Sequence, residues 1–230
     1  MDHLDARTGL YNRAFFETAL SSEIEQARRY GRSLSLVIFD VDGFKRINDA
    51  LGHAAGNMLL TDIGRILQRN LRGSDIACRI GGDEFALILP ETTLQGSEVV
   101  FARLLRLVRQ GSTGRFGSEI TISGGGGECE SDEAQGLFVR VDDAVYRAKK
   151  QGPGSIAAAG PPAPLPARHS GVGWTGYSPT RAETAGRADV TWEYLVEPAD
   201  IDRARLEELG RQGWELATAA KGRLFFKRRG

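Results

Sequence analysis

Four carboxylates in two short stretches stand out as groups that could do chemistry. Asp40 and Asp42 directly follow an apolar segment, and Asp83 and Glu84 directly follow a pair of glycines. Magnesium prefers hard oxygen ligands, usually one or two carboxylates completed by substrate phosphates and water. Glycines let a ligand approach the backbone closely, although either cluster taken alone also suits a simple turn. Together they predict a magnesium-nucleotide site.

The segments around these carboxylates alternate between strand and helix patterns. Residues 34–39 are short, β-rich and nearly all apolar, which is typical of a strand buried on both faces. Residues 75–80 and 85–89 flank the glycine pair, so they predict a β-hairpin with a glycine turn. Asn12 is the expected N-cap of a helix within 8–29. The other predictions are helices at 44–48, 54–71, 94–110 and 141–150, the third with Val99 on its apolar side, and a strand at 120–123 that runs into four glycines. This alternation indicates an α/β or α+β domain on one central sheet.

Composition narrows the class of protein. The 230 residues include 30 Lys+Arg and 30 Asp+Glu, and 41% are hydrophobic, so a folded core is expected and a dedicated nucleic-acid module is not. Two cysteines, Cys78 and Cys129, are too few for a disulfide framework, which favours a reducing compartment. No apolar run approaches the roughly 20 residues of a membrane span, and the first residues lack a signal-peptide pattern. We therefore expect a cytoplasmic protein with no membrane or nucleic-acid partner.

A change in composition divides the chain. Most of its prolines fall between residues 151 and 190, which predicts a linker over 157–188 between a domain at 1–156 and a small module at 189–230. Strands at 191–196, 214–217 and 223–227, with a helix at 201–211 ended by Gly213, give the module a βαββ pattern. Because about 40 residues is near the lower limit for independent folding, we expect this module to dock or to self-associate.

Three motifs in order carry a family resemblance. The segments at 5–13, 39–49 and 79–85, the last reading Arg-Ile-Gly-Gly-Asp-Glu-Phe, resemble those of the GGDEF family of diguanylate cyclases over residues 1–156. The resemblance implies a mixed sheet wrapped by helices, as in adenylyl cyclases and polymerase palms, and the condensation of two GTP molecules into cyclic di-GMP with release of two pyrophosphates. The C-terminal module weakly resembles small domains of the DUF4177 type, which implies no activity.

The resemblance also implies roles for individual residues. Asp40, the backbone carbonyl of Val41 and Asp83 would hold Mg²⁺ or Mn²⁺, two ions per GTP site, with Asp83 and Glu84 as catalytic residues beside the metal and the reacting hydroxyl. Asn48 would read guanine, and Lys45 and Lys149 would contact phosphate. The implied substrate-binding positions are Phe44, Lys45, Asn48, His53, Asn57, Gly81, Gly82 and Lys149.

Two positions depart from the family pattern. Asn57 stands where an aspartate is usual, and its amide offers one acceptor together with a donor that could suit adenine. Pro153 stands where the family commonly has a phosphate-binding arginine. Two alternatives therefore stay open: a non-catalytic receptor for cyclic di-GMP, and a cyclase that makes an adenine-containing cyclic dinucleotide. The intact Asp40, Asp83 and Glu84 favour an enzyme, because a receptor needs no metal ligands.

A regulatory site and a partner are also implied. Arg72 and Asp75 match the family's product-inhibition motif, and Arg103 matches an accessory arginine from an adjoining domain; otherwise Arg72 and Asp75 form a surface ion pair of little worth. One domain would hold one GTP, so two copies of the chain must face each other as a homodimer. We expect residues 189–230 to promote that pairing.

Overall fold

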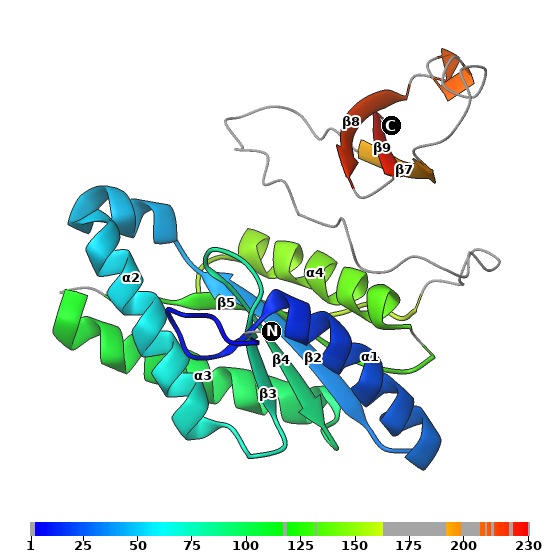
Figure 1. The fold of residues 1–230 in the computed structure, drawn as a ribbon. Helices are drawn as coiled ribbons and strands as arrows, with labels where there is room; N and C mark the ends of the chain where they lie inside the picture. The colour runs from blue at the N-terminus through cyan, green and yellow to red at the C-terminus, as the bar shows by residue number, and fades with distance from the viewer. Residues whose placement is uncertain are drawn as a thin grey trace. The chain divides into compact units, whose positions relative to one another are not determined.

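The structure, a computed structural model, describes residues 3–116, 119–131, 133–162, 192–198, 208–209, 211–212, 214–220 and 223–229. The chain divides into two compact units, Met1–Arg168 and His169–Gly230 (Figure 1).

The first unit is built on a six-stranded mixed sheet. Its strands are β1 (Tyr11–Asn12), β2 (Leu34–Val41), β3 (Ile76–Arg79), β4 (Glu84–Pro90), β5 (Ile122–Glu128) and β6 (Ile156–Ala158). The strand order is β1-β3-β4-β2-β5-β6, with β1 parallel to β3, β6 parallel to β5, and the other pairs antiparallel. The predicted fold class is therefore confirmed. The sheet continues to Ala158, two residues past the predicted end of the domain.

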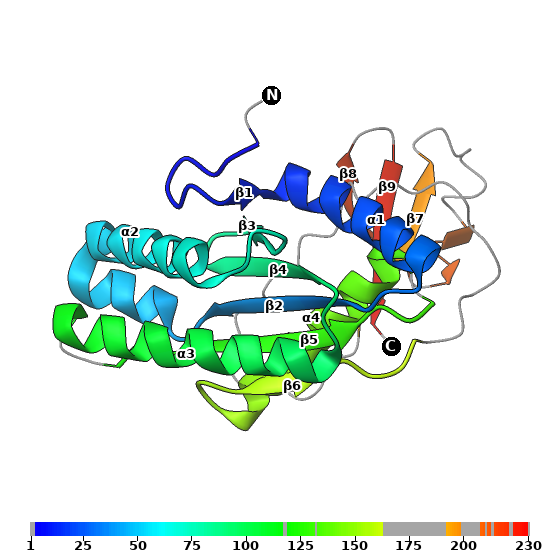
Figure 2. The same cartoon turned by 90° about the horizontal axis from the view of Figure 1, so that it is seen from below.

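Four helices cover the two faces of this sheet: α1 (Arg13–Tyr30), α2 (Phe44–Asn70), α3 (Leu94–Phe116) and α4 (Ala134–Gln151). α1 and α4 lie on one face, where Phe16 and Phe138 pack with their ring centroids 5.9 Å apart. α2 and α3 lie side by side on the other face (Figure 2). Strands β2 and β4 are thus covered on both sides, which explains their continuous apolar runs.

Local sequence signals set the start of α1 and a break within α2. The side chain of Asn12 accepts a hydrogen bond from the Phe15 N–H, so it is the N-cap of α1 as predicted. α2 contains Gly52 at φ 83° and ψ 158°, a conformation outside the helical region that divides it into two arms. These arms correspond to the two helices predicted at 44–48 and 54–71.

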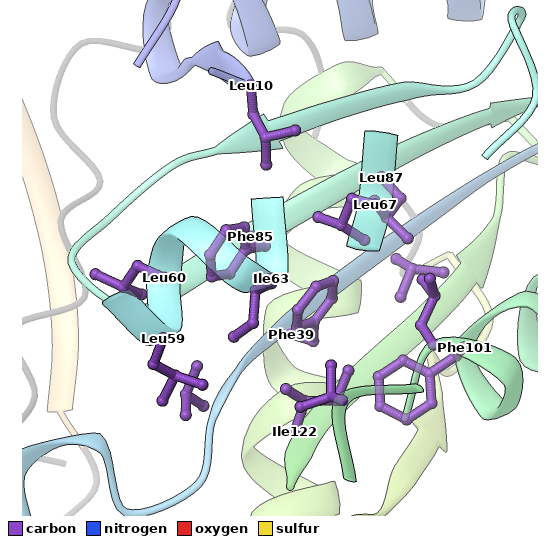
Figure 3. Close-up of a cluster of buried hydrophobic side chains, with 14 of the residues drawn as sticks. Leu10, Phe39, Leu59, Leu60, Ile63, Leu67, Phe85, Leu87, Phe101 and Ile122 are labelled. Atoms are coloured by element: carbon purple, nitrogen blue, oxygen red, sulfur yellow. The ribbon is translucent and has the colours of Figure 1, made fainter. Parts of the chain in front are cut away.

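The main core lies between the sheet and the α2–α3 layer. Phe39 of β2 stacks on Phe85 of β4 with centroids 5.3 Å apart, and Phe101 of α3 meets Phe39 edge-on at 6.1 Å (Figure 3). Leu59, Ile63 and other apolar residues of α2 close the cluster. These aromatic contacts hold β2 and β4 in one register, in which Phe39 faces Phe85.

Three expectations were wrong in detail. β2 ends at Val41 and not at Phe39, so Asp40 lies inside the strand and not after it. The four glycines at 124–127 do not follow a strand but form the middle of β5, between β2 and β6. Val99, predicted on the apolar side of its helix, is 70% exposed, because α3 is rotated so that Phe101 and Leu104 face the core.

The second unit contains a three-stranded antiparallel sheet. Its strands β7 (Trp192–Pro198), β8 (Glu215–Ala220) and β9 (Arg223–Arg229) are ordered β7-β9-β8. The three predicted strands are present with shifted ends. Most of the predicted helix at 201–211, and Gly213 after it, lie outside the described residues.

In the part of the chain that the structure describes, no helix is both long enough and apolar enough to cross a membrane.

Close packing requires three of the four glycines of β5, at 124, 125 and 127, whereas Gly126 has room for a side chain. A Cβ at Gly125 would lie 2.7 Å from the Val145 nitrogen and would also collide with the Val141 carbonyl of α4, whereas at Gly126 the nearest atom is 3.4 Å away. We predict that Gly125→Ala lowers the free energy of unfolding by about 1–3 kcal/mol, the usual cost of overpacking. Gly126→Ala, the matched control, leaves it nearly unchanged or raises it. Urea unfolding of both variants measures the difference; equal stabilities would contradict the close approach of α4.

Candidate functional site

Two carboxylates of the site lie opposite each other on neighbouring strands. Asp40 of β2 pairs with Glu84 of β4, one position along from the Phe39–Phe85 pair. Because successive strand residues point to opposite faces, the phenyl rings enter the α2–α3 core and the carboxylates point to the face that α4 covers. Asp40 is only 2% exposed.

Lys149 of α4 accompanies the buried carboxylate. Its Nζ contacts Asp40 Oδ2 across the layer between helix and sheet. The Lys149 side chain stays 28% exposed, against 3% for that of Asp40, so the lysine links a buried charge to the surface. Burying a charge is costly without a partner. The lysine therefore neutralises Asp40 and remains within reach of an anion bound beside it.

The glycine hairpin places Glu84. A Cβ at Gly81 would collide with the Glu84 carboxylate, so the absence of a side chain lets that carboxylate fold against the turn. The N–H groups of Ile80 and Gly81 both donate to the Glu84 carbonyl, at 3.0 and 3.4 Å, and close the hairpin. Asp83, at the tip, is half-buried. The predicted glycine turn is confirmed as the connection between β3 and β4.

Arg79 ties the hairpin to the N-terminal segment. Its Nη1 donates to both carboxylate oxygens of Asp5, at 3.1 and 3.2 Å, and its Nε and Nη2 donate to the Gly82 carbonyl, at 3.1 and 2.7 Å. Asp5 Oδ1 also accepts from the N–H and the Oγ1 of Thr8, at 2.9 and 2.7 Å. Both residues lie in motifs visible in the sequence, but their spacing gives no sign that they meet.

The protonation of Asp5 reflects these contacts. Partial burial raises the pKa of its carboxyl, but the hydrogen bonds from Thr8 and from Arg79, together with the arginine charge, lower it by more. The resulting pKa lies below the ordinary value of 3.8. Asp5 is therefore ionised, and its charge stabilises the folded state.

Asp42 has a structural role. Its carboxylate accepts from Thr121 Oγ1 at 2.6 Å, from Ser123 Oγ at 2.7 Å, and from the Gly154 N–H at 2.9 Å. Ser123 belongs to β5, Thr121 directly precedes that strand, and Gly154 lies in the turn after α4. Asp42 therefore joins the end of β2 to that turn, and its oxygens are already engaged by protein donors.

The predicted base-reading residues come together at the bend of α2. A Cβ at Gly56 would collide with Asn48 Oδ1 and would lie 3.2 Å from a ring carbon of Phe44, so this glycine lets the two arms touch. Asn48 and Phe44 thus lie beside the helical turn that carries Asn57. His53 and Lys45 are exposed on the same helix.

The predicted regulatory residues gather at the connection between α2 and β3. The Arg72 N–H donates to Asp75 Oδ2 at 2.9 Å, and the Asp75 N–H donates to the Arg72 carbonyl at 3.0 Å, which makes a tight turn. Arg103 of α3 donates from Nη2 to the Asn70 carbonyl at 2.7 Å, at the end of α2. The exposed Arg72 guanidinium is thus presented on a rigid turn near a second arginine.

The thiol of Cys78 is unsuited to chemistry, and the described side chains do not form a metal centre by themselves. Burial raises the pKa of the Cys78 thiol to about 12, so this side chain stays protonated. Among the described residues, no three His, Cys, Asp or Glu side chains come together as a metal-binding group.

Comparison with known proteins identifies a family for most of the first unit. Residues 2–155 match the family model described as "Diguanylate cyclase, GGDEF domain". The chain is 40% identical over 152 residues to diguanylate cyclase DgcP of Pseudomonas aeruginosa, and 36% identical over 155 residues to the probable diguanylate cyclase DgcC of Escherichia coli. These alignments cover 64% and 66% of this chain but 22% and 42% of the relatives, so the chain spans less than half of their length.

A solved structure shows the same architecture. The GGDEF domain of DgcB from Caulobacter crescentus, in complex with c-di-GMP, superposes with a TM-score of 0.65 at 27% identity. The match covers 69% of this chain and 94% of that domain. The match therefore supports the fold of the first unit.

The Asp5–Arg79 ion pair predicts a pH dependence of stability. Because the folded-state pKa of Asp5 is depressed, its contribution is present above the unfolded value of 3.8 and is lost as pH falls through the folded value. We expect Asp5→Asn to lower the urea midpoint at neutral pH and to flatten its decline below about pH 4. Asp62→Asn, which removes the exposed ion pair with Arg65, is the control and keeps the wild-type decline. Parallel curves for wild type and Asp5→Asn would contradict the role of this pair.

Proposed function

Because this chain belongs to the GGDEF family of diguanylate cyclase domains, which its residues 2–155 match, we propose that its first unit condenses two GTP molecules into cyclic di-GMP. The observation that carries the proposal is the Asp40–Glu84 carboxylate pair, with Lys149 on one side and the glycine hairpin on the other. In each half-reaction a ribose 3′-oxygen bonds to the α-phosphorus of the other GTP. The bond to the β-phosphate oxygen breaks, and pyrophosphate leaves.

The start of α2 supports a phosphate site near these carboxylates. Gly43, at φ 67°, is its N-cap, no side chain caps the helix, and the first turn holds no acidic residue. Free N–H groups at a helix N-terminus carry partial positive charge and suit phosphate oxygens. Lys45 is exposed in this turn, and Asp40 lies only three residues before Gly43. We assign the triphosphate to this end of α2, with Lys149 as a further cation.

The donor chemistry fits magnesium or manganese. Asp40, the Val41 carbonyl and Asp83 are the residues that would hold two ions per GTP site, all through hard oxygen atoms. Among the residues that the structure describes, no three acidic, histidine or cysteine side chains gather, which agrees with the preference of magnesium for one or two carboxylates plus substrate phosphates. When bound, such ions neutralise phosphate charge and lower the pKa of the attacking hydroxyl.

The protein groups themselves position the reactants. In our assignment Glu84, held against the hairpin by Gly81, lies beside the 3′-hydroxyl and accepts its proton. Backbone at Gly81 and Gly82 approaches the phosphates where a side chain would block them. Asn48, with Phe44 beside it, faces the base, and His53 and Asn57 complete the binding surface.

The stoichiometry requires two copies of the domain. Each first unit holds one GTP, so two units must bring their sites together around a two-fold axis. We propose a homodimer as the active form, with residues 189–230 as the segment that raises the concentration of one catalytic unit around the other. Mass analysis of the products formed from GTP with and without ATP tests whether Asn57 admits adenine.

We also propose product inhibition at the turn of Arg72 and Asp75, with Arg103 completing the site. A guanidinium can bind guanine N7 and O6 or a phosphate through two parallel hydrogen bonds. The rigid turn presents Arg72 for such contacts without using any residue of the carboxylate site. Binding of c-di-GMP by the related DgcB domain makes this dinucleotide the effector of choice.

We predict that Asp83→Ala lowers cyclic dinucleotide formation by about a hundredfold or more, because the proposed site loses one of its carboxylates. The substitution leaves the fold intact, since Asp83 lies at a half-buried turn. Mass analysis of products from GTP and Mg²⁺, with and without ATP, measures both rate and base choice. Asp143→Ala, an exposed position on α4, is the control. Activity of Asp83→Ala within a few fold of wild type would refute the proposed role.

We predict that Arg72→Ala raises the half-inhibitory concentration of cyclic di-GMP by about tenfold or more, since a paired arginine contact is lost. The uninhibited rate stays unchanged, because Arg72 lies outside the carboxylate site. Arg69→Ala, an exposed arginine of α2, serves as the control. Product titration of the three proteins decides the question, and overlapping inhibition curves would leave the turn as a surface feature.

A further inference from the structure

Arg109 of α3 reaches the turn that follows α4. Its Nη2 lies so close to Gly154 that a Cβ there would collide with it. Its Nε is buried and has no hydrogen-bond partner in the described part of the chain. A buried donor without an acceptor is costly, so such a group calls for an explanation.

The turn at 152–154 borders the carboxylate site. The Gly152 N–H donates to the Lys149 carbonyl at 3.3 Å, which ties the start of the turn to the lysine that contacts Asp40. The Gly154 N–H donates to Asp42 Oδ2 at 2.9 Å and to Ser123 Oγ at 3.1 Å. Ser123 is in turn the strand partner of Asp40. Arg109 is therefore separated from the site by a single ordered turn.

The turn itself supplies no positive charge. Residues 151–154 read Gln-Gly-Pro-Gly and carry no cation, and the proline lacks an N–H donor. Within the described residues, Arg109 makes no ion pair. Guanidinium groups offer several donors in one plane and match phosphate oxygens well.

We propose that Arg109 is a substrate-binding residue that donates hydrogen bonds to the terminal phosphates of GTP from the outer side of the 152–154 turn. The inference rests on the proposed function, and it extends the phosphate site from the start of α2 and Lys149 to α3, which packs beside α2. In a purely structural alternative, Arg109 only balances the charge of Asp42 through the turn. Its loss would then affect the binding of GMP and of GTP equally.

The test compares nucleotides that differ in their phosphates. Affinities of the full chain for GMP and for the α,β-methylene analogue of GTP, whose carbon bridge blocks cleavage, are measured by calorimetry with Mg²⁺. We expect Arg109→Gln to weaken binding of the analogue by about tenfold and to leave GMP binding unchanged, because only the terminal phosphates lose a charged partner. Arg109→Lys, which keeps the charge, recovers part of the loss. Arg106→Gln, an exposed arginine one turn earlier on α3, binds both ligands as wild type does.

Each outcome separates the two claims. Wild type that binds neither nucleotide overturns the proposed function, and this inference with it. Wild type that binds the analogue while Arg109→Gln binds it equally well overturns the inference alone. Equal weakening for GMP and for the analogue, or a lowered unfolding temperature without a change in nucleotide preference, also assigns Arg109 to packing and overturns the inference.

Discussion

The stacking of Phe39 on Phe85 is the contact on which the candidate site depends. It holds β2 and β4 in a register that places the next pair, Asp40 and Glu84, opposite each other on the other face of the sheet. A slip of one residue would exchange the two faces and bury the carboxylates in the aromatic core. Packing on the α2–α3 face of the sheet therefore positions the two carboxylates on the α4 face.

Two sets of polar contacts hold the surrounding loops against strands β2 and β4. Arg79 joins the glycine hairpin to Asp5 in the N-terminal segment, and Asp42 joins the end of β2 to the turn after α4. Both use charged groups that accept or donate several hydrogen bonds at once, which fixes geometry more strongly than neutral pairs do. The N-terminal segment is thus connected directly to the hairpin that carries Asp83 and Glu84.

Three glycines also shape the first unit, because each leaves room for a neighbouring group. Gly81 admits the Glu84 carboxylate, Gly56 admits the Asn48 amide, and Gly125 admits the backbone of α4. In each case a missing side chain lets two elements approach more closely than any other residue would permit. The proposed nucleotide surface is therefore formed by close approach of backbone to side chain rather than by a deep apolar cavity.

By itself, the sequence determined the alternation of strands and helices, the Asn12 cap, the glycine hairpin and the family of the first unit, because periodicity, capping and motif spacing are local properties. It also allowed the two arms of α2 to be predicted, since Gly52 interrupts the helical pattern. Only the tertiary structure decided that the four glycines form β5, that Asp42 is structural, and that Arg79 meets Asp5. It alone brought Arg109 to Gly154. Those contacts join residues far apart in the chain, and their partners are chosen by packing of the sheet and its helices, which no local pattern records.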